Sequence, residues 1–234
     1  MNIPLDKIIG TLKVLPTAKK DVDEPVRVAV FVDGSASADL IAAVRDAFVP
    51  QTTSALVRVE RLGAEPVSLK ADTDLSLVLT GGSEQLQGAV QEIVIGGAPT
   101  VIVTDDAAAV SFIREETPVL GYVAEPDRSR LQVELAHAII SRVEKRLAFA
   151  ANFPFLRVAA ASEVIRSAAL GNALTGALVF IPGADFPVMT AAQLGMMAQL
   201  ALVFGKPIRP ERAWEAAGVV ASAFLVRALA RQLV

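Results

Sequence analysis

The sequence contains no cysteine and only one histidine, one tryptophan and one tyrosine in 234 residues. The lack of cysteine excludes disulfides, thiolate metal sites and cysteine nucleophiles. A single histidine, His137, cannot form a histidine metal cluster. We also find no paired nucleophile and base and no motif of paired carboxylates, so the sequence predicts a protein that is not an enzyme.

Aromatic residues are scarce as well, at 5% of the chain, although 53% of it is hydrophobic and the mean hydropathy is +0.50. The hydrophobic excess therefore consists of Ala, Val and Leu. This composition is typical of alanine-rich helices and of parallel strands buried on both faces. The length suffices for one large domain or two modest ones.

Charge is unevenly distributed along the chain. Residues 1–156 carry fifteen Lys/Arg against twenty-one Asp/Glu, whereas residues 157–234 carry seven against four. The acidic part argues against nucleic acid as a partner, and the basic part is compatible with an anionic membrane surface. The N-terminus does not resemble a secretory signal. We expect a cytoplasmic protein, with the inner face of the membrane as a second, peripheral location.

Alternating apolar strands and amphipathic helices over residues 25–150 predict an α/β fold, a mostly parallel, Rossmann-like sheet with helices on both faces. The predicted buried strands are 26–32, 75–80, 100–104 and 119–123. The predicted helices follow them at 37–48, 83–95, 106–116 and 127–150. Residues 55–62 and 66–70 predict an antiparallel hairpin, because no helix fits between them.

The two ends of the chain read as helical. Residues 1–24 predict a short amphipathic helix followed by a linker, and Pro154 marks the change to an all-α helical domain over residues 151–234. Within it, the apolar runs 167–184 and 186–205 are each near the roughly 20 residues that span a bilayer. Their Ala, Gly and amide content favours a buried hairpin, with membrane insertion as the alternative.

The loop Asp33–Ser37, after the first predicted strand, is the first candidate site. The order of elements, with the predicted hairpin, resembles a small GTPase. A phosphate loop needs a lysine, but the first basic residue after this loop is Arg45. The D-x-x-G and N-K-x-D motifs are missing too. The resemblance therefore implies a degenerate GTPase-like domain without a nucleotide, in which Gly34, Ser35 and Ser37 hold a vestigial phosphate-loop position. A tight turn followed by a helix cap explains the same residues.

A second interpretation uses the same loop to hold a metal ion. The sequence D-x-S-x-S at Asp33, Ser35 and Ser37 resembles the metal-ion-dependent adhesion site of von Willebrand A domains. That resemblance implies further ligands from the loop 81–83 and from Asp105. The implied cofactor is Mg²⁺, a hard cation that prefers oxygen ligands. The sequence departs from the pattern with Ser83 in place of a threonine, an aspartate after Asp105, and a short separation between the motifs.

The last third of the chain carries a different resemblance. Its features are a P-G-A-D turn, a T-A-x-Q-L helix start, two methionines and a glycine stop. These residues are Pro182, Gly183, Ala184, Asp185, Thr190, Ala191, Gln193, Leu194, Met196, Met197 and Gly205. The stretch resembles an uncharacterised helical domain associated with Era-like GTPases in bacteria.

Together the two halves predict a non-catalytic interaction protein: a pseudo-GTPase-like domain that carries a helical docking module. The module would dock a protein partner or a second copy of the chain, with a membrane surface as a further candidate. The alternative function is a Mg²⁺-dependent von Willebrand A-like binding domain, with Asp33, Ser35, Ser37 and Asp105 as metal ligands.

Overall fold

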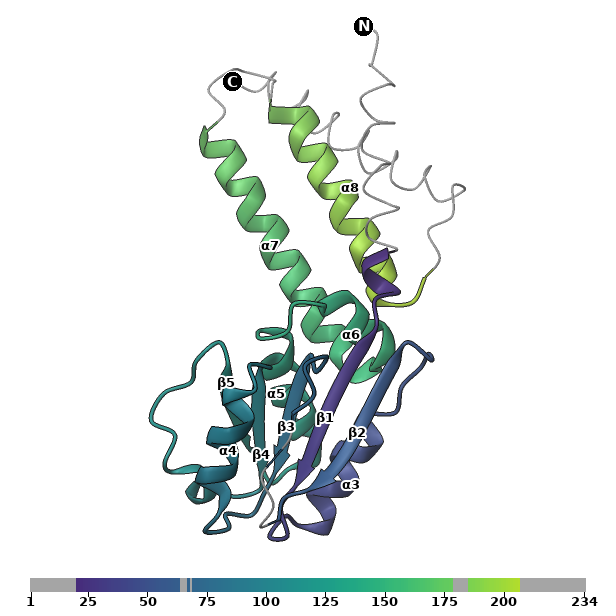
Figure 1. Cartoon of the computed structure of the whole chain (residues 1–234). Coiled ribbons are helices and arrows are strands. Elements are labelled where there is room, and N and C mark those ends of the chain that lie inside the picture. Colours follow the sequence, from purple (N-terminus) through teal and green to yellow (C-terminus); the bar gives the residue numbers. More distant parts are fainter. Residues whose placement is uncertain (1–19, 64–66, 68, 179–184, 207–234) are drawn as a thin grey trace, which may run out of the picture. The chain divides into compact units, whose positions relative to one another are not determined.

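The computed structural model describes residues 20–63, 67, 69–178 and 185–206 (Figure 1). The chain forms two compact units, one of residues 21–162 and one of residues 1–20 with 163–234. We call the first the α/β unit and the second the helical unit, and each is described by itself.

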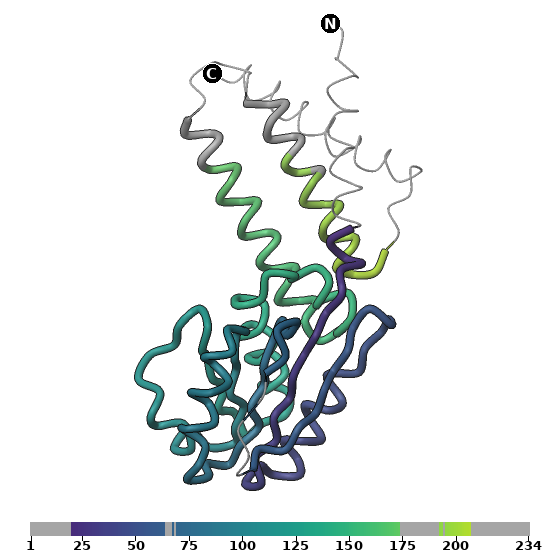
Figure 2. Tube along the Cα trace, viewed as in Figure 1, coloured from purple at the N-terminus to yellow at the C-terminus, as the bar shows by residue number. Residues whose placement is uncertain are grey.

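The α/β unit is built on a five-stranded sheet whose described strands are all parallel. The strands are β1 (Val26–Val32), β2 (Ala55–Arg61), β3 (Leu75–Leu79), β4 (Thr100–Thr104) and β5 (Leu120–Ala124). Their order is β2-β1-β3-β4-β5, so β1 lies inside the sheet between β2 and β3 (Figure 2). Every residue of β3 and β4 is buried, as their near-continuous apolar runs predict. The predicted α/β class is confirmed.

The predicted antiparallel hairpin is wrong. Residues 55–61 form β2, but it pairs in parallel with β1, with Val26 opposite Ala55. The described residues of the segment 66–70 are not in a strand. The helix α3 (Ala38–Ala47) already supplies the crossover that a parallel β1–β2 pair requires. The strand order is thus the flavodoxin-like doubly wound order, and the hairpin that suggested a small GTPase is absent from the described sheet.

Helices cover both faces of the sheet. On one face, α4 (Leu86–Ile95) buries Leu86, Val90 and Ile93 in a cluster with Phe31, Val78 and Ile102. On the other face, α5 (Arg128–Ile140) contacts β4, β5 and α3. Within the described residues, the hydrophobic core therefore lies in two layers on either side of the sheet.

Two predicted helices are shorter than expected. After β4 the helix predicted to reach residue 116 is only a 3₁₀ turn, η1 (Ala107–Val110). Phe112 and Ile113 follow it and pack against the core cluster instead of continuing a helix. The long helix predicted over 127–150 is two helices, α5 and α6 (Arg146–Asn152), because the chain turns at residues 141–145.

The α/β unit extends past the predicted boundary at residue 150. Its last elements are α6, the 3₁₀ turn η2 (Pro154–Leu156) and the first residues of α7 (Arg157–Leu178). Phe48 at the end of α3 packs on Phe153 and Phe155, with ring centroids 5.0 and 5.2 Å apart. These aromatic contacts draw the segment after Pro154 into the α/β unit, so its boundary falls at residue 162.

The described part of the helical unit contains the rest of α7 and the helix α8 (Asp185–Val203). Gly205 follows α8 with a φ of +64° and donates its amide hydrogen to Leu202 O, which confirms the predicted glycine stop. None of the described helices is long and apolar enough to cross a membrane. Residues 1–19 of the predicted amphipathic helix and linker, residues 207–234 of the predicted helical domain and the turn residues 182–184 lie outside the described residues.

Candidate functional site

The order of the strands creates a topological switch point at one edge of the sheet. From β1 the chain leaves through α3 to β2 on one side, whereas from β3 it leaves through α4 to β4 on the other. The carboxyl ends of β1 and β3 therefore flank the topological switch point, where ligands bind in open α/β sheets. The loops 33–37, 80–83 and 104–106 all begin at this edge.

Asp33 lies at the centre of the edge, directly after β1. Only 1% of its surface is exposed. Its Oδ2 accepts hydrogen bonds from Ser35 Oγ at 2.9 Å and from Thr80 Oγ1 at 2.7 Å. Its backbone amide donates to Leu79 O at 2.9 Å, so the ends of β1 and β3 are joined through both the main chain and the side chain.

The loop after β3 packs tightly against the loop after β1. Gly81 N donates to Ser35 Oγ at 3.0 Å, and Gly82 N donates to Thr80 Oγ1 at 2.9 Å. A Cβ placed on Gly81 would lie 2.3 Å from the main-chain oxygen of Ser35, and Gly82 has a φ of +95°. Both glycines are therefore needed for this close approach.

The loop after β4 contributes the second carboxylate. Ser37 Oγ donates a short hydrogen bond to Asp105 Oδ2. The same oxygen accepts from Leu40 N at 3.1 Å, so Ser37 also caps α3, as predicted. Asp106 is engaged differently, because its Oδ1 accepts from Ala108 N at 2.9 Å and caps η1. Of these two aspartates, only Asp105 forms a hydrogen bond with the described loop after β1.

Asp33 is ionised at neutral pH in spite of its burial. Burial alone would raise the pKa of its carboxyl group, but hydrogen bonds donated by Thr80 and Ser35 outweigh it and leave the pKa below its ordinary value. The nearby Ser83 hydroxyl acts in the same direction, yet its Oγ is buried and makes no hydrogen bond of acceptable geometry to a described residue. We therefore assign the lower pKa to Thr80 and Ser35.

The charge of Asp33 is not balanced by an ion pair within the described part of the chain. Among the described residues, no Lys or Arg side chain forms an ion pair with it. Arg45, the first basic residue after the loop, bonds Asp46 at 3.0 Å and is exposed. A buried carboxylate is normally paired with a cation or bound to a metal, because desolvation of a lone charge is costly.

All the residues predicted for the metal site, Asp33, Ser35, Ser37 and Asp105, lie in these edge loops, linked in two hydrogen-bonded pairs. No three His, Cys, Asp or Glu side chains gather into a metal-binding group in the described part of the chain. The site thus offers two carboxylates with several hydroxyls, a donor set that suits Mg²⁺ with retained waters.

The residues at the predicted phosphate-loop position form a tight turn. Gly34 is exposed, and a Cβ added to it would meet nothing within 4 Å. Ala36 N donates to Asp33 O at 3.0 Å, which closes a tight turn directly before the Ser37 cap. The interpretation of this loop as a tight turn and helix cap is confirmed.

Sequence reasoning missed Thr80. It is fully buried, and it both donates to Asp33 and accepts from Gly82. The signal was a polar residue directly after the buried strand β3, at the edge where parallel strands end. The adhesion-site resemblance instead implies a ligand from the following loop, residues 81–83.

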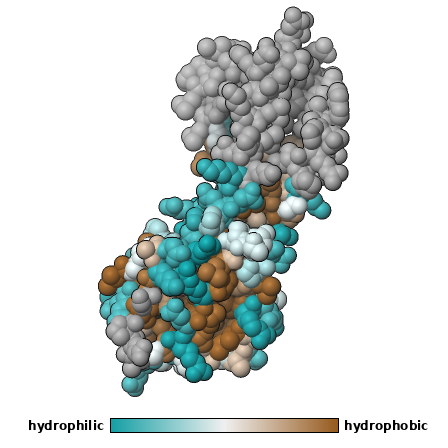
Figure 3. All heavy atoms as spheres, turned by 45° about the vertical axis from the view of Figure 1, so that its right-hand side comes forward, coloured by the Kyte–Doolittle hydropathy of each residue, from teal (hydrophilic) through white to brown (hydrophobic). Residues whose placement is uncertain are grey.

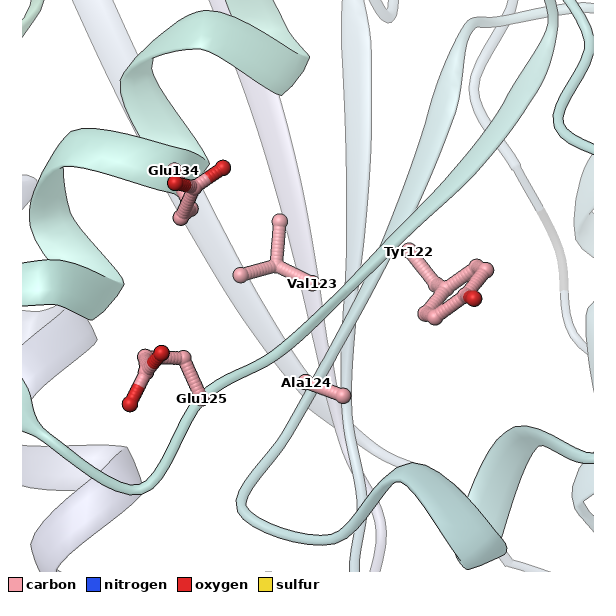
Figure 4. A pocket seen from close by; sticks show the side chains of 5 residues that line it. All are labelled: Tyr122, Val123, Ala124, Glu125 and Glu134. Carbon is pink, nitrogen blue, oxygen red and sulfur yellow. The ribbon is translucent and has the colours of Figure 1, made fainter.

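A separate hollow of about 210 Å³ lies beside β5 (Figure 4). Its lining is Tyr122, Val123, Ala124, Glu125 and Glu134, and Tyr122 lies on the opposite side of the strand from Glu134. Glu125 Oε1 already accepts from Asp127 N at 3.1 Å. None of the predicted site residues lines this hollow.

The fold and the site together define a doubly wound α/β domain with a hydroxyl- and carboxylate-lined switch point. Comparison with protein-family models, with curated proteins and with solved structures finds no match to this chain.

Proposed function

We propose that the α/β unit is a non-catalytic binding domain that holds Mg²⁺ at the carboxyl edge of its sheet. The observation that carries this proposal is the buried Asp33 carboxylate, which accepts hydrogen bonds from Ser35 and Thr80 but has no ion-pair partner among the described residues. A divalent cation beside Asp33 would supply the compensating charge.

The ligands would come from both sides of the switch point. Ser35 and Ser37 offer hydroxyl oxygens from the loop after β1, and Asp105 offers a carboxylate from the loop after β4. Thr80 would act as a positioning residue, because it holds Asp33 rather than facing outward. Mg²⁺ keeps several waters in such sites, and an oxygen ligand of a binding partner can replace one of them.

Isothermal titration of the full chain with MgCl₂, at constant ionic strength and after treatment with a chelator, tests the proposal. We expect one site per chain. Asp105→Asn should weaken binding at least about tenfold, because one of the two charged ligands is lost. Asp106→Asn is the matched control, since its carboxylate caps η1. No binding by the wild-type chain, or equal loss in both variants, would contradict the proposal.

A second candidate is a docking protein that needs no metal, with a pseudo-GTPase-like α/β unit and a helical unit that binds a protein, a second copy or a membrane surface. It is favoured by the absence of a lysine from the loop 33–37, because the first basic residue after this loop is Arg45, which bonds Asp46. Titration with GTP, GDP and ATP tests it. Micromolar binding of any of them would end this interpretation.

A further inference from the structure

The outer edge of β2 is an open edge of the sheet, and β2 carries exposed apolar side chains. In β2, Val59 is 67% exposed and Leu56 is 45% exposed. No described strand pairs with this edge. In Figure 3 the side of the molecule that carries β2 faces forward. Hydrophobic residues lie at this surface of the α/β unit among hydrophilic ones. An open edge of this kind is a template for pairing with another strand.

The hydrogen bonds to β1 establish which groups of β2 face outward. Ser54 O accepts from Val26 N at 3.1 Å, and Leu62 N donates to Val32 O at 2.9 Å. In a parallel ladder every second residue turns its main-chain groups to the same neighbour. The even-numbered residues of β2 therefore face β1, and the odd-numbered ones present free N–H and C=O groups at the outer edge.

The charge pattern of β2 is complementary to itself in one antiparallel register. Arg58 and Glu60 flank Val59. If two copies of β2 pair about a two-fold axis at Val59, each Arg58 lies opposite Glu60 of the other copy. Registers centred on residue 58 or residue 60 would instead place two like charges opposite each other, which is unfavourable. A register centred between residues would pair outward-facing with inward-facing main-chain groups.

We propose that the outer edge of β2 pairs antiparallel with β2 of a second copy of this chain, about a two-fold axis at Val59. The odd-numbered residues Val57, Val59 and Arg61 then supply about six main-chain hydrogen bonds, two at each of three pairs. Arg58 and Glu60 occupy the non-hydrogen-bonded positions, where cross-strand side chains approach most closely. The two sheets would form one continuous sheet of two copies.

The existing ion pair of Arg58 is compatible with this arrangement. Arg58 bonds both carboxylate oxygens of Asp72, at 3.0 and 3.1 Å. This pair holds the guanidinium in one place on the strand, while Glu60 is exposed. Asp72 also pairs with Arg27 at 3.7 Å, so a Glu60 carboxylate from a second copy would join a network of Arg58, Asp72 and Arg27.

Sedimentation velocity of the full chain over a range of concentrations tests the proposal, with circular dichroism to verify folding. We expect a monomer–dimer equilibrium. Val59→Pro removes an outward N–H, which an edge strand tolerates, and should abolish the dimer. Glu60→Arg should raise the dimer Kd about tenfold or more, because it places arginines opposite each other. Glu134→Arg, at an exposed position of α5, is the matched control and should leave the Kd unchanged.

A mixing experiment tests the register itself. Copies with Glu60→Arg carry two arginines at these positions, and copies with Arg58→Glu carry two glutamates. Each variant alone should be mainly monomeric, whereas a mixture should form heterodimers with about the wild-type Kd. A wild-type chain that stays monomeric, a dimer that survives Val59→Pro, or variants that fail to pair when mixed would each overturn the proposal.

Discussion

Ser37 donates a hydrogen bond to Asp105, 68 residues further along the chain and two strands away in the sheet. The contact exists because every described strand is parallel, so the loops after β1 and β4 open on the same edge. Together with the Asp33–Thr80 bond it ties three loops into one polar site.

Thr80→Val should lower the free energy of unfolding at pH 7 by about 1–3 kcal/mol. The substitution keeps the shape of the side chain but removes the hydroxyl that donates to Asp33 at 2.7 Å and accepts from Gly82. Urea unfolding followed by circular dichroism measures the loss. Thr80→Ser retains the hydroxyl and should recover most of the stability. Equal losses in the two variants would show that the methyl group, and not the hydrogen bond, matters.

Gly81→Ala should destabilise the α/β unit by about 1–3 kcal/mol, the usual range for a side chain forced into a packed site. The new methyl group would lie 2.3 Å from the main chain of Ser35. Gly34→Ala is the matched control, because its Cβ meets nothing within 4 Å and should cost little. A large effect at Gly34 and a small one at Gly81 would contradict the described packing of the two loops.

Asn152→Ala should be among the most destabilising single substitutions in α6, at about 1–3 kcal/mol. The Asn152 side chain is fully buried, and it accepts from Thr52 Oγ1 at 2.7 Å and donates to Ala148 O at 3.0 Å. The bond from Thr52 connects the turn before β2 to α6, whereas the bond to Ala148 lies within α6. Thermal unfolding of the variant measures the effect, with Ser162→Ala on the exposed part of α7 as a control expected to change little.

The stability of the α/β unit should fall in acid. The pKa of Asp33 is lower in the folded chain than the ordinary value of about 3.9. A carboxyl of this kind contributes stability above its unfolded pKa, and the contribution is lost as the pH falls toward its folded pKa. We expect the free energy of unfolding, measured without Mg²⁺, to drop as the pH falls below about 5.

Asp33→Asn is the variant that isolates this contribution. Its unfolding free energy should depend less steeply on pH in the same range, because one titrating group is removed. Curves that run parallel for the wild-type chain and the variant would show that the acid sensitivity comes from other groups.

Much of the sheet could be predicted from the sequence because its inner strands are continuous apolar runs. β1, β3 and β4 are examples, and the polar residues that follow them, including Asp33 and Asp105, gather at one edge for that reason. The pairing of β2 could not be read in the same way. An alternating, half-exposed strand looks alike at a parallel edge and in an antiparallel hairpin, and only the crossover through α3 distinguishes them.

The shortened helix after β4 and the role of Thr80 depend on tertiary packing in the same way. Residues 107–116 have helical composition, but the packing of Phe112 and Ile113 into the core ends the helix after one turn. The role of Thr80 could not be predicted, because a single threonine carries no motif. Its role depends on β3 lying beside β1, which is a tertiary fact.

Paramagnetic NMR tests most directly whether a cation binds at the switch point. In a ¹⁵N-labelled full chain, substoichiometric Mn²⁺ used as a substitute for Mg²⁺ should first broaden the amide signals of residues 33–37, 81–82 and 105, and excess Mg²⁺ should reverse this. Broadening centred on the Glu125 and Glu134 hollow, or no selective broadening in the α/β unit, would contradict a cation site at the switch point.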